Sequence, residues 1–179
     1  MYKIEKNVLS KEDLYKIKYH LKDLHWTCGC DSLQYLENEL FEVQKPFQGM
    51  ARETLKEPIG KTEKELNKLA QKVADEVCKR QNLNADIIRI TWNFYKRSDT
   101  GMIFHIDTDN INVDVEKYYS ILFSLNDSDG YLQINKFKIK DKENEAKIFK
   151  SNLLHKGVAP IKDYFRINLN LVLNLFICK

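Results

Sequence analysis

Three residues whose side chains bind metals predict a single metal site: His105, Asp107 and, fifty positions after the first of them, His155. Two imidazoles and one carboxylate form a ligand set that holds Fe(II) on one face and leaves the remaining coordination positions open. In a strand, residues i and i+2 share a face, so His105 and Asp107 can point at one ion while Phe104 and Ile106 face away. The spacing therefore predicts an iron site with open positions for further ligands.

A His-x-Asp pair is a weak signal by itself. The alternative interpretation is that His105 is an ordinary hydrogen-bonded histidine and that Asp107 opens a polar loop. Two later residues favour a site. His155 ends a short apolar run before a glycine turn, and Arg166 follows eleven positions later, at the start of the run FRINLNLVLN.

Apolar and polar residues alternate almost perfectly from residue 165 to residue 177, and Arg166 lies on the polar side. A period of two predicts a strand with one apolar face. The polar face also carries three asparagines: Asn168, Asn170 and Asn174. This face could simply be exposed to solvent, but lysine and glutamate would then be more typical, whereas asparagines suit an enclosed polar cavity. A planar guanidinium in such a cavity is suited to bind a carboxylate with two hydrogen bonds.

Strands in the second half of the chain must hold these residues. Between residues 86 and 95 the alternation recurs, with Asn93 and Tyr95 on the polar face. The segments YYSILFSLN, YLQINKFKI and AKIFK predict further strands and hairpins. Loops are expected at 96–101 and 108–117.

Two amphipathic helices are expected before these strands. The pairs that resemble capping boxes are Ser10 with Asp13 and Thr62 with Glu65. The apolar stripes are Leu14, Ile17, Leu21 and Leu24 in the first helix and Leu66, Leu69, Val73 and Val77 in the second. The second helix is expected to end near residues 80–84. Each helix has one apolar side, so we expect both to pack on the apolar face of the strand at 165–177.

This order of elements predicts a mainly β protein with N-terminal helices. Seven or eight short strands, each with one polar and one apolar face, favour a double-stranded β-helix, a cupin-like jelly roll, braced by two or more helices. We expect one domain over 1–179, with helical support in 1–85 and the jelly-roll core in 86–179. A short strand is expected within 1–9, and a long loop at 41–60 that could help to form a substrate entrance.

The composition is that of an ordinary globular protein, with 43% hydrophobic and 31% charged residues and a net charge of +3. The small charge and the dispersed Lys and Arg residues argue against nucleic-acid binding. No apolar run approaches membrane-spanning length. Cys28 and Cys30 lack the two-residue spacer of zinc and redox motifs, so we expect reduced thiols and a cytoplasmic protein. The sequence gives no prediction of oligomeric state.

The motif HID at 105–107, the later His155 and the run YFRINLNLVLN together resemble the 2-oxoglutarate/Fe(II)-dependent dioxygenases. The similarity is to the prolyl-4-hydroxylase-like branch, with its short phage and bacterial members. Tyr95 and Gly101 before the first histidine, YYSILFSLND followed by DGYLQI, and AKIFKSNLLHKGVAP also look like family segments. The resemblance covers roughly residues 86–175.

Three positions depart from the family pattern. The turn reads Asp129-Gly130 where two glycines are usual, and KDKENEAK replaces the usual Pro-Gly before His155. Phe123 lies where some relatives carry a tyrosine that contacts the co-substrate.

The resemblance implies an oxidoreductase that uses Fe(II), 2-oxoglutarate and O2. It implies that His105, Asp107 and His155 bind the iron and that Arg166 pairs with the distal carboxylate of 2-oxoglutarate. Tyr95 and, less directly, Asn168 or Asn93 are further candidates to bind this co-substrate.

The implied reaction is hydroxylation of a prolyl peptide or a free amino acid. Nucleic acid is disfavoured, because the base-repair branch carries a second arginine where this chain has Val172. Two other interpretations stay open: a non-catalytic jelly-roll binding module, and a jelly-roll metalloenzyme that does not use 2-oxoglutarate.

Overall fold

The computed structural model describes residues 2–24, 26–28, 49–55, 60–98, 102–108 and 115–176. The strands are β1 (Lys3–Lys6), β2 (Thr27–Cys28), β3 (Gly49–Glu53), β4 (Ala85–Lys96), β5 (Tyr118–Ser124), β6 (Ser128–Ile134), β7 (Phe137–Asp141), β8 (Glu145–Lys150), β9 (His155–Val158) and β10 (Phe165–Leu175). The helices are α1 (Lys11–His20) and α2 (Lys61–Gln81), with short 3-10 helices η1 (Leu21–Asp23) and η3 (Val115–Lys117).

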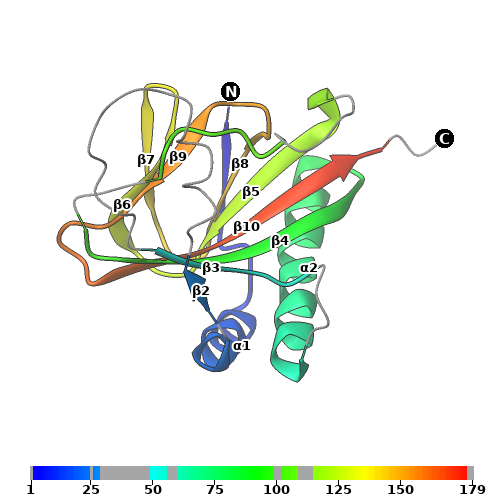
Figure 1. Ribbon diagram of the computed structural model, residues 1–179. Helices are drawn as coiled ribbons and strands as arrows, with labels where there is room; N and C mark the ends of the chain where they lie inside the picture. Colours follow the sequence, from blue (N-terminus) through cyan, green and yellow to red (C-terminus); the bar gives the residue numbers. More distant parts are fainter. Residues whose placement is uncertain are drawn as a thin grey trace.

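The strands form two sheets that face each other (Figure 1). The large sheet has the order β1-β8-β5-β10-β4-β3-β2, and the small sheet the order β7-β6-β9. Every pairing is antiparallel. Consecutive strands after residue 85 repeatedly cross from one sheet to the other. This is the topology of a double-stranded β-helix, and the predicted fold class is confirmed.

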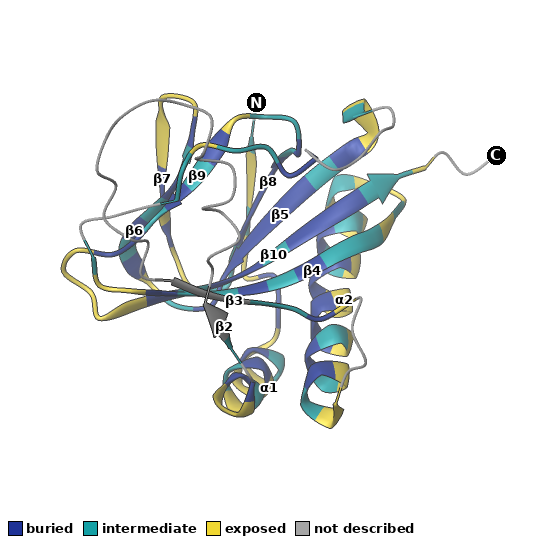
Figure 2. Cartoon of the chain, in the orientation of Figure 1, coloured by how far each residue is buried: buried dark blue, intermediate teal, exposed yellow. Residues whose placement is uncertain are grey.

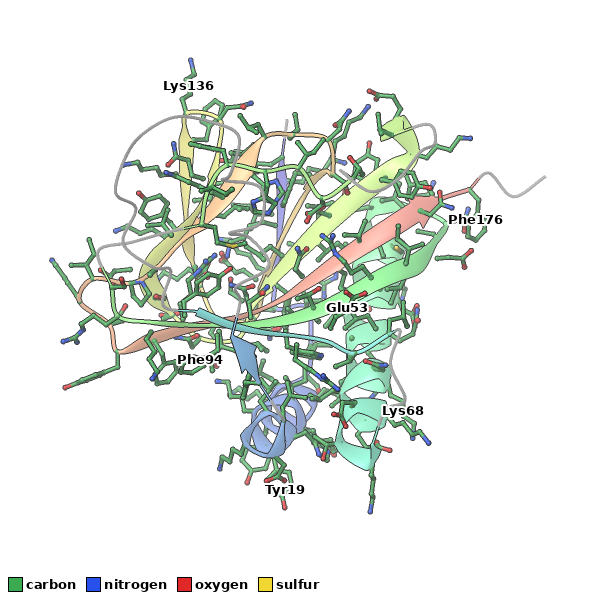
Figure 3. The ribbon with its side chains drawn as sticks, viewed as in Figure 1. Tyr19, Glu53, Lys68, Phe94, Lys136 and Phe176 are labelled. Atoms are coloured by element: carbon green, nitrogen blue, oxygen red, sulfur yellow. The ribbon has the colours of Figure 1, made fainter. Side chains whose placement is uncertain are left out.

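Both helices pack on the outer face of the large sheet, as predicted (Figure 1). Every residue of the two predicted helical stripes is buried, and the core that they form includes Leu169, Leu171 and Leu173 on β10. The strands β5 and β10 are buried along most of their length (Figure 2). Tyr19 and Lys68 project from the outer sides of the helices (Figure 3). The helices therefore cover the apolar face of the strand that carries Arg166 and turn its polar face towards the small sheet.

A smaller apolar cluster fills part of the space between the sheets: Leu122, Leu132, Ile134, Ile139 and Phe149. Phe123 belongs instead to the core beneath the helices. Because adjacent residues of a strand face opposite ways, the interior positions of β5 are Ser120, Leu122 and Ser124. Phe123 therefore faces away from the interior that holds Arg166.

Of the two predicted capping boxes, only the one at the start of α1 is present in the structure. Ser10 caps α1 as predicted, and its side-chain oxygen accepts a hydrogen bond from the backbone N–H of Asp13 at 3.1 Å. The predicted capping box at Thr62 is wrong, because α2 begins at Lys61 after Gly60, with no side-chain cap. The helix ends at Asn82, whose positive φ of 53° is the left-handed conformation that asparagine tolerates. No helix in the described ranges is long and apolar enough to cross a membrane.

The first half of the chain contributes strands as well as helices. The strand β1 is present where a short strand was predicted and pairs with β8. Part of the loop expected at 41–60 is instead the strand β3, which pairs with β4. Residues 41–48 and 56–59 of that expected loop lie outside the described residues. The large sheet is thus extended at both edges by segments that precede the predicted jelly-roll core.

Candidate metal and co-substrate site

The three predicted metal ligands lie together between the two sheets. One ligand atom from each of His105, Asp107 and His155 can be chosen so that all three lie within 4.8 Å of one another. His155 opens β9, and His105 is joined to it by an isolated antiparallel bridge. The strand expected around His105 and Asp107 is therefore reduced to this bridge, and Asp107 lies in the turn that follows.

Backbone carbonyls orient both imidazoles. The Nδ1 atom of His105 lies 3.1 Å from the carbonyl oxygen of Ile103, and the Nδ1 atom of His155 lies 2.9 Å from that of Leu153. An Nδ1–H that donates to a carbonyl leaves Nε2 unprotonated in the neutral ring, and that nitrogen can bind a metal. The Nε2 atom of His155 points at Asp107, 3.5 Å from its Oδ2 atom.

Asp107 is held by side chains from three neighbouring strands. Ser120 on β5 donates to Oδ2 at 2.5 Å, and Asn170 on β10 donates to Oδ1 at 3.3 Å. Arg89 on β4 forms an ion pair with Oδ1. The hydroxyl of Ser151 lies 2.8 Å from that of Ser120. The carboxylate orientation is therefore set by the large sheet, with Oδ2 on the side of the histidine.

The protonation states favour metal binding. Burial alone would raise the pKa of Asp107, but the Arg89 guanidinium, with His155 and the Ser120 hydroxyl, holds that pKa below its ordinary value. Burial also lowers the pKa of His155, although the Asp107 carboxylate partly offsets this effect. A carboxylate that stays ionised and an imidazole that stays neutral are the forms that bind a divalent metal.

Arg166 begins the interior face of β10 and is completely buried, as the cavity interpretation predicted. Its guanidinium lies over the ring of Tyr95 at 4.7 Å, and its Nε donates to Asp141 Oδ2 at 2.6 Å. The two terminal nitrogens, Nη1 and Nη2, have no acceptor in hydrogen-bonding geometry within the described ranges. Buried donors without acceptors are rare in native proteins and call for a partner such as a water molecule, an ion or a ligand.

The other two predicted co-substrate residues lie beside Arg166. Tyr95 is buried opposite it in the β4–β10 register, and its hydroxyl donates to Met102 Sδ at 3.3 Å. Asn168 is also fully buried and accepts a hydrogen bond from Asn93 at 3.1 Å, while its own Nδ2 atom has no partner among the residues described. Unsatisfied donors thus continue from Arg166 along β10 towards the metal-ligand cluster.

The sequence analysis missed four residues of this site: Arg89, Ser120, Asp141 and Lys147. Arg89 shares the polar face of its strand with Asn93 and Tyr95, but that position alone indicates no role. Ser120 could have been found from the period-two pattern of β5, because it shares the interior face with Ser124. Asp141 and Lys147 sit in a highly charged turn segment, KDKENEAK, where nothing local separates the two buried charges from the exposed ones.

Comparison with solved structures agrees with the fold. The neighbours include a viral collagen prolyl hydroxylase from Paramecium bursaria Chlorella virus-1 in complex with 2-oxoglutarate, with a TM-score of 0.61 and 15% identity, covering 98% of this chain and 96% of that one. A prolyl hydroxylase from Trichoplax adhaerens, in complex with a hypoxia-inducible-factor peptide fragment, matches with a TM-score of 0.58 and 16% identity, over 98% and 83% of the two chains.

A third similar structure is HygX from Streptomyces hygroscopicus with nickel and 2-oxoglutarate bound, with a TM-score of 0.65, 9% identity and coverage of 97% and 82%. No protein-family model matches the sequence, and the search of curated proteins found no match either. The predicted resemblance is therefore confirmed as a shared fold: the chain has the fold of the 2-oxoglutarate/Fe(II)-dependent oxygenases.

Proposed function

We propose that this protein is an Fe(II)- and 2-oxoglutarate-dependent dioxygenase that hydroxylates its substrate. The observation that carries the proposal is the pairing of two features inside one barrel. A cluster of two histidines and one aspartate lies beside β10, and a buried arginine with two unpartnered nitrogens begins that strand. The fold alone would not support this function, because one fold hosts many activities.

His105, Asp107 and His155 are the residues that would hold the iron. Their donor set, one anionic oxygen and two neutral nitrogens, fits Fe(II) with open positions for further ligands. Bound Fe(II) and 2-oxoglutarate together supply the oxidation chemistry, which couples decarboxylation of 2-oxoglutarate to oxidation of a substrate by O2. The protein keeps the aspartate ionised and points Nε2 of His155 at it.

Arg166 would bind the distal carboxylate of 2-oxoglutarate. Two parallel N–H groups match the two oxygens of a carboxylate, and burial strengthens the interaction because water does not compete for it. Asn168 offers a further unpartnered donor in the same region. Tyr95 supports the arginine through its ring, which lies under the guanidinium. A metalloenzyme that does not use 2-oxoglutarate would leave Arg166 without a partner. A non-catalytic jelly-roll binding module would not need the three metal ligands and the arginine together.

The substrate is proposed to be a prolyl peptide, with a free amino acid as the alternative. Prolyl hydroxylases are among the proteins that share the fold, and the one from Trichoplax adhaerens is seen with a peptide. Nucleic acid is disfavoured because the net charge of +3 provides little attraction for phosphates.

The test of the proposed function is a binding and turnover experiment on the full chain. Calorimetric titration should show one Fe(II) per chain, and Asp107→Ala should lose most of this binding because it removes the only anionic ligand. The iron-loaded protein should bind 2-oxoglutarate and convert it slowly to succinate without added substrate. A protein that takes up iron but neither binds nor decarboxylates 2-oxoglutarate would exclude the proposal.

Substrate class can then be separated by succinate release. Proline-containing peptides, free amino acids and methylated oligonucleotides should be compared at equal concentrations. Stimulation by prolyl peptides is the expected result. Stimulation by the oligonucleotides alone would contradict the proposed substrate class while leaving the dioxygenase assignment intact.

A further inference from the structure

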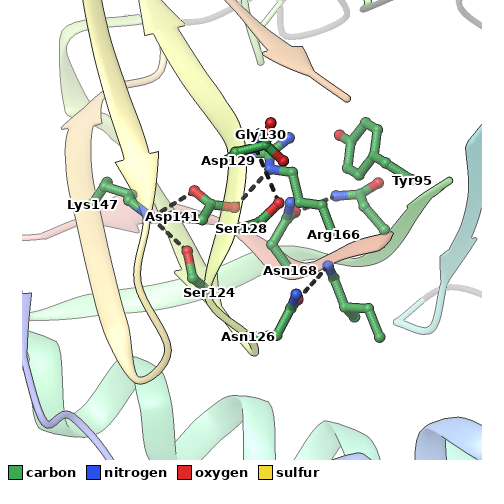
Figure 4. A network of polar contacts seen from close by, with 12 residues as sticks. Tyr95, Ser124, Asn126, Ser128, Asp129, Gly130, Asp141, Lys147, Arg166 and Asn168 are labelled. Carbon is green, nitrogen blue, oxygen red and sulfur yellow. Dashed lines mark hydrogen bonds and ion pairs between the residues drawn. The ribbon is translucent and has the colours of Figure 1, made fainter. Parts of the chain in front are cut away.

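A buried cluster of three charged side chains lies behind the candidate co-substrate site. Asp141 at the end of β7 accepts a hydrogen bond from Arg166 Nε through Oδ2 at 2.6 Å and another from Lys147 Nζ through Oδ1 at 2.7 Å. All three side chains are completely buried. Lys147, on β8, also donates to the hydroxyl of Ser124 on β5 (Figure 4). The aspartate, from the small sheet, thus connects an arginine and a lysine that lie on two different strands of the large sheet.

The charges of this cluster do not cancel. Burial would raise the pKa of Asp141, but Arg166 and Lys147 hold it below its ordinary value, so the carboxylate is ionised at neutral pH. Burial lowers the pKa of Lys147, and the carboxylate of Asp141 limits this effect. Burial keeps the neighbouring Tyr95 neutral by raising its pKa. Two cations and one anion leave one net positive charge in the interior, which favours the binding of one further anion.

The terminal nitrogens of Arg166 are available to bind that anion. Asp141 uses only Nε, whereas Nη1 and Nη2 have no acceptor in the part of the chain that the structure describes. A β-carbon added to Gly157 would lie 2.9 Å from both Arg166 Nη1 and the Tyr95 hydroxyl, so the glycine keeps the space beside the guanidinium clear. The two terminal nitrogens can therefore form a two-pronged contact with a carboxylate.

We propose that Asp141 and Lys147 are positioning residues for co-substrate binding: Asp141 holds the guanidinium with its terminal nitrogens free, and Lys147 cancels the charge of Asp141. This inference rests on the proposed function and deepens it. Without Lys147, Arg166 and Asp141 form a neutral pair with little attraction for a second carboxylate. With Lys147, the cluster matches an acid that carries a carboxylate at each end better than a 2-oxo acid with an uncharged tail.

Substitutions that remove a charge separate this role from simple packing. Lys147→Met has nearly the length of lysine, leaves Asp141 paired with Arg166 and brings the cluster to zero net charge. The double variant Asp141→Asn with Lys147→Met returns the cluster to one positive charge, as in the unaltered chain. Lys140→Met, on the exposed residue next to Asp141, is the matched control.

The measurement is the affinity of each variant for 2-oxoglutarate, by calorimetry on anaerobic Mn(II)-loaded protein. Lys147→Met should bind it about thirtyfold more weakly than the unaltered chain, with Mn(II) affinity unchanged. Its affinity for 2-oxopentanoate, which lacks the second carboxylate, should stay the same. The double variant should bind 2-oxoglutarate at least about tenfold more tightly than Lys147→Met does. Two independent packing defects would instead make the double variant bind more weakly than either single variant.

Each outcome decides the proposal. Equal 2-oxoglutarate affinity in Lys147→Met and the unaltered chain would overturn it, as would a double variant weaker than either single change. An equal loss for 2-oxopentanoate would also overturn it, because that loss would show a packing defect. Should the methionine variant fail to fold, Lys147→Gln removes the same charge, keeps a donor for Asp141 and carries the same expectation. If the unaltered chain itself does not bind 2-oxoglutarate, the proposed function fails first.

Discussion

The guanidinium of Arg89 forms an ion pair with the carboxylate of Asp107, which is also the anionic member of the candidate metal-ligand cluster. Arg89 contacts Oδ1, whereas Ser120 donates to Oδ2 on the side of His155. The two carboxylate oxygens of Asp107 thus contact different side chains. We expect the oxygen on the histidine side to bind the metal and the other to remain with the arginine.

Arg89→Met should weaken Fe(II) binding by about tenfold to a hundredfold, which is typical when a residue that orients a metal ligand is removed. The Asp107 carboxylate would then rotate more freely and would lose a partner that keeps it ionised. Calorimetric or fluorescence titration of the metal measures the effect. Arg97→Met is the control, because Arg97 directly follows the same strand but stacks on Tyr164 at the surface. Equal losses in both variants would argue against a specific role for Arg89.

Arg166→Met should weaken 2-oxoglutarate binding by roughly a hundredfold, or about 3 kcal/mol, because it leaves the distal carboxylate unpaired in a buried site. Metal affinity should be nearly unchanged, since the arginine contacts none of the three ligands in the structure. Parallel titrations of metal and of 2-oxoglutarate check this prediction. A loss of metal binding equal to the loss of 2-oxoglutarate binding would indicate a general collapse of the site.

Gly157→Ala should weaken 2-oxoglutarate binding by about tenfold while preserving metal binding, because the new methyl group would displace the ends of two side chains, Arg166 and Tyr95. Gly130→Ala provides the contrast. There the added carbon would meet Arg166 Cδ at 2.8 Å and also the backbone carbonyl oxygen of Val158 at 2.9 Å. The backbone cannot move as easily as a side chain, so a lower melting temperature should accompany the loss of affinity. Affinity titration and thermal unfolding of both variants separate the two effects. A fall in melting temperature alone for Gly157→Ala would contradict the prediction.

The stability of the fold should depend on Asp141 in acid. Arg166 and Lys147 depress its pKa below the ordinary value of 3.8, so the folded state binds this proton less readily than the unfolded state. Its contribution to stability is therefore complete above about pH 4 and is lost as the pH falls through the folded-state pKa. Asp107, whose pKa is also lowered, acts in the same range.

Asp141→Asn should lower the free energy of unfolding at pH 7 by about 3 kcal/mol or more, because two buried cations lose their counter-ion. It should also make the stability fall less steeply below pH 4. Urea unfolding between pH 2 and pH 7 measures both effects. Asp75→Asn, at an exposed position on α2, is the control and should leave the stability at pH 7 unchanged. An acid dependence identical in Asp141→Asn and the unaltered chain would contradict the prediction.

Local periodicity was enough to predict the strand that matters most. Leu169 and Leu171 alternate with Asn168 and Asn170, and the structure turns the first pair to the helices and the second pair to the interior. Phe123 likewise lies on the helix side of β5, as the alternation of its own strand requires. The face of a strand is a local property, which one sequence can show.

Asp141 and Lys147 show where local reasoning ends. Lys142 and Glu143 stand between them and are exposed, with the same residue types and a similar neighbourhood in sequence. The difference comes from strand pairing. The pairing of β7 with β6 and of β8 with β5 brings Asp141 and Lys147 together beside Arg166, whereas Lys142 and Glu143 stay at the surface. Burial of a charge depends on partners distant in sequence, and only the three-dimensional structure reveals them.

The backbone bridge between His105 and His155 has a consequence for how a metal would be exchanged. Each residue donates its N–H to the carbonyl of the other, both at 2.9 Å, although fifty positions separate them along the chain. Backbone hydrogen bonds of this bridge, and not the ion, therefore offset the chain entropy that is lost on closing the long loop. A chelator should strip the metal reversibly while the protein stays folded, in contrast to small domains that fold only around their zinc. Hydrogen exchange at these two amides, measured with and without metal, would show whether the backbone bridge persists when the metal is absent.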